Sequence, residues 1–354
     1  MTERGGCMMC IYLGDNEQLT YKKQEHVFPA GLGGKQKLAQ GIVSDQANEL
    51  FSPLELKLMR TSFVSFDRIM FGPGKRGSLL QQNASKSPVN VGLQENGKPV
   101  LCYTAMGKPY SIPQFHLQRD EVIVSVPNEH RDAKEQFEQF VRVLKCFSKE
   151  YKFLCNENIP QGELIVGFFD DKYYVAASEA VEKEQVSKYI EKFLESFEIT
   201  EMYEDSQHAK QSYRICENAE VARVYAKVAI NTLAFLKGEN YVRHPNFNEI
   251  KEWILTGKSE NNFFFLPQIE AVPRDFFMSI LPDKAHWCIL MCNNGNLDAV
   301  VCFYNTILRR FTLGKLPDKK SFMVDGFICD WQMGKEYTLQ NFVNEFIRSN
   351  NSET

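Results

Sequence analysis

A glycine-rich segment directly after a carboxylate–histidine pair constrains the front of this 354-residue chain most strongly. Glu25-His26 is followed by the apolar residues 27–29 and then by Gly31-Leu32-Gly33-Gly34. Glycine adopts positive φ without steric cost, so this run predicts a chain reversal. Gly41-Ile42-Val43 would return as the second strand. The pattern therefore predicts a strand pair that carries Glu25 and His26 on its first arm.

A helix is predicted directly after this strand pair. Ser44 or Asp45 can accept hydrogen bonds as its N-cap, and apolar residues follow at Phe51 and Leu54. Asn48 falls in the first turn of this helix, where free backbone N–H groups favour anions. The front of the chain thus reads as a hairpin followed by a helix that carries an asparagine.

The order of these motifs resembles the HNH endonuclease family and its ββα-metal fold. The similar features are Glu25-His26, Leu32-Gly33-Gly34, Asn48 and the segment 51–55, preceded by the C-x-x-C pair Cys7 and Cys10. The resemblance covers about residues 7–70. It implies hydrolysis of a DNA phosphodiester bond by a metal-dependent nuclease, and a role in defence or in a mobile element is common in the wider family.

The resemblance also implies a role for each site residue. His26 would be the general base, because a neutral imidazole takes a proton from water at neutral pH. Asn48 would be the second catalytic residue and orient His26 through a hydrogen bond. Glu25 and Glu55 would be metal ligands, and their oxygen atoms suit Mg²⁺ or Mn²⁺.

The chain departs from the family at a second cysteine pair. In the most similar bacterial branch a C-x-x-C-N motif opens the helix, whereas this chain has Ser44 and Ala47 there. Cys7 and Cys10 remain as residual zinc ligands. Two thiolates alone cannot hold a structural zinc as firmly as four do, so structural Zn²⁺ is not expected from this pair alone.

The remainder of the chain predicts an α+β protein of several parts. We expect an N-terminal HNH module over 1–72, a polar linker or long loop over 73–100, and a larger mixed α+β domain over 101–354. Strands are expected at 121–126, 164–168, 287–291, 299–304 and 308–313. Helices are expected at 131–153, 181–197 and 220–237, the last nearly apolar all round and closed by Gly238.

The composition of the chain limits the kinds of partner that it can bind. The net charge of −4 argues against a protein that coats nucleic acid by bulk electrostatics. Residues 1–80, with ten Lys/Arg against eight Asp/Glu, are mildly basic, and Lys75 and Arg76 are candidates for contact with a phosphate backbone. The absence of a long apolar run and of a secretory pattern at the start predicts a cytoplasmic protein with no membrane partner and with reduced thiols.

The sequence is also compatible with two alternatives to the nuclease. One is a catalytically silent nucleic-acid-binding or scaffolding module built on a degenerate HNH frame, which Ser44 and Ala47 favour and the retained Glu25, His26 and Asn48 oppose. The other places the function in the larger domain, with the front module structural.

Overall fold

The chain leaves its first folded unit and later returns to it. In the computed structural model, Met1–Ser85 and Arg214–Thr354 together form one unit, here called unit 1, and Lys86–Tyr213 form unit 2. The structure describes residues 9–118, 121–127, 132–148, 150–196, 209–211, 215, 217–259, 263, 279–317 and 324–351. These boundaries differ from the expected division at 72 and 101, because the core of unit 1 joins segments far apart in sequence.

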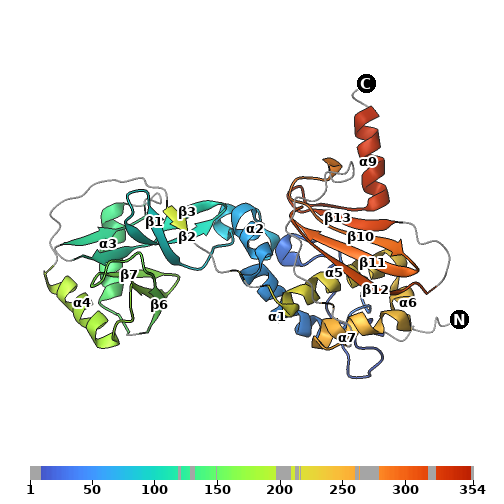
Figure 1. The fold of residues 1–354 in the computed structure, drawn as a ribbon, viewed down its shortest axis with the longest axis horizontal. Helices are drawn as coiled ribbons and strands as arrows, with labels where there is room; N and C mark the ends of the chain where they lie inside the picture. The colour runs from blue at the N-terminus through green and yellow to red at the C-terminus, as the bar shows by residue number, and fades with distance from the viewer. Residues whose placement is uncertain are drawn as a thin grey trace. The chain divides into compact units, whose positions relative to one another are not determined.

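Unit 1 is built on an antiparallel sheet with strand order β12-β11-β10-β13-β14. Helix α5 packs against this sheet, with α1 and α7 beside it (Figure 1). The bounds of its elements are α1 (Asp45–Thr61), α2 (Phe63–Phe71), α5 (Ala219–Lys237), α6 (Glu239–Val242), α7 (Asn248–Thr256), β10 (His286–Asn293), β11 (Asn296–Phe303), β12 (Ile307–Lys315), β13 (Asp325–Asp330), β14 (Lys335–Thr338) and α9 (Leu339–Asn351).

The two faces of this sheet bury different partners. Along β10, Cys288 and Leu290 enter the main core with α5, whereas Trp287 and Ile289 face a second cluster that includes Phe342 of α9. This alternation is the period of two that a strand imposes on its side chains. The start of the C-terminal helix α9 therefore packs against the face opposite to α5, whereas the rest of this helix is largely exposed (Figure 1).

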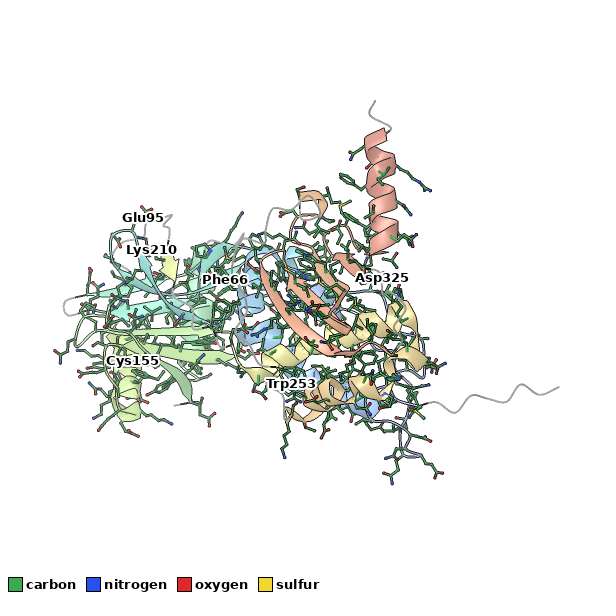
Figure 2. The ribbon with its side chains drawn as sticks, turned by 45° about the vertical axis from the view of Figure 1, so that its right-hand side comes forward. Phe66, Glu95, Cys155, Lys210, Trp253 and Asp325 are labelled. Atoms are coloured by element: carbon green, nitrogen blue, oxygen red, sulfur yellow. The ribbon has the colours of Figure 1, made fainter. Side chains whose placement is uncertain are left out.

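Unit 2 contains two sheets. One has the order β3-β2-β1-β9 and the other the order β5-β4-β7-β8-β6, against which α3 and α4 pack. In Figure 2, Lys210 of β9 is labelled close to Glu95, which follows β1. The bounds are β1 (Asn90–Gln94), β2 (Pro99–Ala105), β3 (Lys108–Ser111), β4 (Gln114–Leu117), β5 (Val122–Ser125), α3 (Ala133–Leu144), β6 (Tyr151–Cys155), β7 (Leu164–Phe169), β8 (Lys172–Ala177), α4 (Lys183–Ser196) and β9 (Ala209–Gln211).

The α+β class and most of the predicted elements are confirmed. The expected strands correspond to β5, β7, β10, β11 and β12, and the expected helices to α3, α4 and α5. Gly238, with φ of 83°, ends α5 as predicted. Among the described residues, no helix is long and apolar enough to span a membrane.

Three local predictions were wrong. The helix expected over 131–153 ends at Leu144, and residues 151–155 instead pair in parallel with β8 as β6. The expected linker over 73–100 contains β1 and the start of β2. The predicted N-terminal strand pair is reduced to an isolated bridge between His26 and Lys37, and its return arm is Gln36–Leu38 and not 41–43, since the tight turn after Pro29 brings the chain back sooner.

Candidate functional site

A short backbone ladder positions Glu25 and His26. The Val27 N–H donates to the Gln36 carbonyl at 2.9 Å, and the Leu38 N–H donates to the Glu25 carbonyl at 2.8 Å. Gly33 has φ of 91°, and a Cβ there would lie 2.6 Å from the Cβ of Trp331, so a larger residue would be both strained and crowded. The glycine turn therefore fixes the arm on which the carboxylate and the histidine stand.

Helix α1 supplies the next part of the site. Of the two predicted N-cap candidates, Ser44 and Asp45, Ser44 is the N-cap, with its Oγ accepting from the Ala47 N–H at 3.3 Å. Asn48 and Glu55 are seven residues apart, two turns along the helix, and therefore lie on one face. Asn48 makes no side-chain hydrogen bond to His26, and its Oδ1 is buried without a partner among the described residues.

The two carboxylates of Glu25 and Glu55 meet on the ammonium of Lys227, which projects from α5. Both make short ion pairs with its Nζ. The Lys227 side chain is only 1% exposed, against 11% for Glu25 and 21% for Glu55. Burial alone would lower the pKa of Lys227, but the two carboxylates outweigh burial and raise it above its usual range. Lys227 is therefore a protonated cation at the point where the expected metal ligands converge.

Asn231, one turn after Lys227, fixes the same arrangement. Its Nδ2 donates to the His26 carbonyl at 2.9 Å and to Glu25 Oε1 at 3.4 Å. Its Oδ1 accepts from the Tyr12 hydroxyl at 2.7 Å. Helix α5 therefore holds the Glu25–His26 arm by side-chain contacts as well as by packing.

The His26 ring is half-buried and has no hydrogen-bond partner in the described part of the chain. Burial lowers its pKa, and the neighbouring Lys37 lowers it further, while Glu55 opposes them. The imidazole is therefore neutral at pH 7, with a ring nitrogen free to accept a proton.

The two predicted basic residues lie on a turn beside the hairpin. Lys75 and Arg76 are exposed in the short helix Lys75–Gly77. Arg68 ties this turn to the glycine turn, with Nε donating to the Gly31 carbonyl at 3.1 Å and Nη2 to the Gly74 carbonyl at 3.0 Å. Both basic side chains therefore lie on an exposed turn next to the glycine turn. This pair, Lys75 and Arg76, is here called the basic rim.

The expected residual zinc ligands are only partly described. Cys7 lies outside the described residues. Cys10 is buried, and its sulfur accepts from the Ser44 N–H and from the Ser44 hydroxyl, both at 3.4 Å. Cys10 and Ser44 are thus as close as two ligands of one zinc would be, but they are joined by hydrogen bonds and not through a metal ion. Within the described residues, no group of three or more His, Cys, Asp and Glu is placed to hold a metal ion.

Lys227 and Asn231 were missed by the sequence-based prediction, which treated the helix as a purely apolar core element. A signal for them existed. A lysine and an asparagine four residues apart inside a buried helix need partners, because an unpaired buried charge is costly. Their partners, Glu25 and Glu55, lie more than 170 residues earlier, and only the fold reveals that proximity.

The structure therefore places an imidazole with a lowered pKa near a carboxylate pair that an internal ammonium neutralises in part. The unpartnered amide oxygen of Asn48 lies on the same helix as Glu55, and the basic rim lies beside the glycine turn. Such a set can move a proton at His26, bind a cation through two carboxylates and contact a phosphate through its rim. Comparison of the chain with protein-family models, with curated proteins and with solved structures finds no match.

Proposed function

We propose that unit 1 carries an HNH-type endonuclease site that hydrolyses a DNA phosphodiester bond with His26 as general base. The observation that carries this proposal is the His26 ring, which is half-buried and free of hydrogen bonds to the described residues, and whose pKa is lowered by burial. A neutral imidazole in that state can take the proton of an attacking water as the water oxygen bonds to phosphorus.

The carboxylate pair supports the same proposal. Glu25 and Glu55 offer oxygen ligands to one point, and the buried Asn48 Oδ1 lacks a partner among the described residues. The two carboxylates are oxygen ligands of the kind that a hard cation prefers, although the cation seen between them is Lys227. Mg²⁺ or Mn²⁺ held by Glu25 and Glu55 would stabilise the negative charge that develops on the phosphate and the leaving oxygen.

The rim would position the substrate. Lys75 and Arg76 are exposed beside the glycine turn that follows His26, and cations in such a place neutralise backbone phosphates whatever the base sequence. Their replacement by glutamate should weaken DNA binding uniformly across sequences and lower its salt dependence.

A second candidate is a catalytically silent nucleic-acid-binding or scaffolding module on the same frame. The Lys227 ammonium favours it, because a charge already neutralised within the chain leaves less attraction for a divalent ion. The two candidates share the DNA-binding rim and differ in whether the bond is broken.

Cleavage of supercoiled plasmid with millimolar Mg²⁺ or Mn²⁺ separates the candidates. The wild type should nick the plasmid, and His26→Ala should lower the rate by about 10²- to 10⁴-fold, the usual contribution of a general base. His244→Ala, which changes another histidine of unit 1, is the matched control and should retain the rate.

Two results would redirect the proposal. DNA binding by the wild type without cleavage in either ion would support the silent module. Cleavage that survives His26→Ala at the wild-type rate would show that another group activates the water.

A further inference from the structure

The expected metal position is occupied by a side chain of the protein itself. Glu25 comes from the hairpin, Glu55 from α1 and Lys227 from α5, and the three side chains meet at one ammonium. In the described residues no third carboxylate, histidine or cysteine joins them to make a group of metal-binding composition. Two carboxylates and one ammonium leave a net charge of −1, where two carboxylates alone would present −2 to an incoming ion.

Lys227 is held in this position from several sides. Its Nζ lies 5.2 Å from the centre of the Phe51 ring, and its backbone carbonyl accepts from the Tyr12 hydroxyl at 3.3 Å. Asn231, one turn further along α5, bonds to both Glu25 and the His26 carbonyl. With its side chain 1% exposed, Lys227 does not reach water as a surface lysine would. The Lys227 ammonium is therefore held in a fixed position within the site.

We propose that Lys227 is the resident cation of the Glu25–Glu55 site, and that a divalent ion binds there only in competition with it. This competition would regulate metal binding at the proposed nuclease site. Its effect on the reaction rests on the proposed nuclease, whereas the competition for binding can be measured without it. In consequence, removing the ammonium converts the carboxylate pair into a site for a hard divalent cation.

Charge gives the direction and the size of the effect. A divalent ion at the carboxylates would lie within a few ångströms of the ammonium, and repulsion at that distance is strong in a poorly solvated site. Loss of the ammonium should therefore tighten Mn²⁺ binding by about 100-fold or more. Methionine suits the test, because it can pack on Phe51 without a charge.

The experiment is titration of the full-length protein with MnCl₂, with bound Mn²⁺ measured by electron paramagnetic resonance and calorimetry. Wild type, Lys227→Met and Lys227→Gln are compared. Lys57→Met is the matched control, because Lys57 is also an ion-paired lysine of unit 1 but is half exposed and pairs with Glu220. Both Lys227 variants should gain one Mn²⁺ site, and the control should bind as the wild type does.

A triple variant tests whether Glu25 and Glu55 are the ligands of the gained site. It also shows whether a change in Mn²⁺ binding comes from misfolding. Adding Glu25→Gln and Glu55→Gln to Lys227→Met should remove the gained site, whereas the folded state should survive because no charge is left unpaired. If Lys227→Met is unfolded without metal, Mn²⁺ should refold it but should not affect the triple variant.

The proposal is overturned if folded Lys227 variants bind Mn²⁺ no more tightly than the wild type, or if the triple variant keeps the gained site. It is also overturned if Mn²⁺ fails to refold unfolded Lys227 variants. Plasmid nicking by the wild type decides the proposed function separately, so the two can fail independently.

Discussion

Replacement of Lys227 by methionine, in the absence of divalent metal, is expected to lower the free energy of unfolding by about 3–5 kcal/mol. The reason is the two carboxylates, which stay behind in a largely buried place with no cation between them. Removing one partner of a buried ion pair costs far more than the pair itself contributes, because the remaining charge is left without water. Urea unfolding followed by circular dichroism measures the difference.

Two companion variants make this prediction specific. Lys57→Met breaks a half-exposed pair with Glu220 and should cost about 1 kcal/mol or less. The triple variant with Glu25→Gln, Glu55→Gln and Lys227→Met should recover most of the stability, since neutral side chains of similar shape replace all three charges. A Lys227→Met protein as stable as the wild type would contradict a buried charge cluster at this point.

Replacement of His286 by alanine is expected to lower the free energy of unfolding at pH 7 by about 3–5 kcal/mol. The ring is fully buried, and its two nitrogens join the sheet to the front of the chain. Nε2 donates to the Leu32 carbonyl at 3.1 Å, and Nδ1 accepts from the Tyr304 N–H at 3.0 Å. The alanine variant leaves a cavity and two buried backbone groups without partners.

The His286 prediction has a pH dependence that distinguishes it from simple cavity formation. Burial lowers the pKa of His286 to about 3 in the folded state, whereas an unfolded histidine titrates near ~6.5. Between these values the unfolded chain binds the proton and the folded one does not. The stability that neutral His286 provides above pH 6.5 is therefore lost as pH falls, by about 1.4 kcal/mol per unit.

Comparison of wild type and His286→Ala at pH 7, 6 and 5 by urea unfolding checks this sign. The stability difference between the two proteins should narrow below pH 6.5, because only the wild type carries the titrating group. A difference that stays constant over this range would show that the folded protein accepts the proton at little cost.

The sequence predicted well those helix ends that are set by the chemistry of a single nearby residue. Ser44 begins α1 because its hydroxyl satisfies a free N–H, and Gly238 ends α5 because it adopts positive φ. The return arm of the hairpin was predicted at the wrong residues. Gln36–Leu38 pair through backbone groups, and three residues are too few to show the alternation of polar and apolar side chains that marks a strand. Apolar periodicity likewise extended α3 beyond Leu144 into a strand.

The composition of the site was predictable only in part. The resemblance to the HNH family indicated Glu25, His26, Asn48 and Glu55 as candidates, and of these Glu25 and Glu55 meet, whereas Asn48 makes no hydrogen bond to His26. Their shared partner Lys227 comes from a helix that joins the same core only after the chain has passed through unit 2. Short motifs describe neighbours in sequence, so they cannot indicate a cation that lies 172 residues after Glu55.

The most direct test of the proposed nuclease is the pH dependence of the single-turnover nicking rate of the wild type beside His26→Ala. Because burial and Lys37 lower the pKa of His26, we expect a wild-type rate that is level at neutral pH and falls only below about pH 6.5. The acid limb should be missing from any residual rate of His26→Ala. A wild type that does not nick DNA at any pH, or an acid limb unchanged in the variant, would contradict the assignment of His26 as the base.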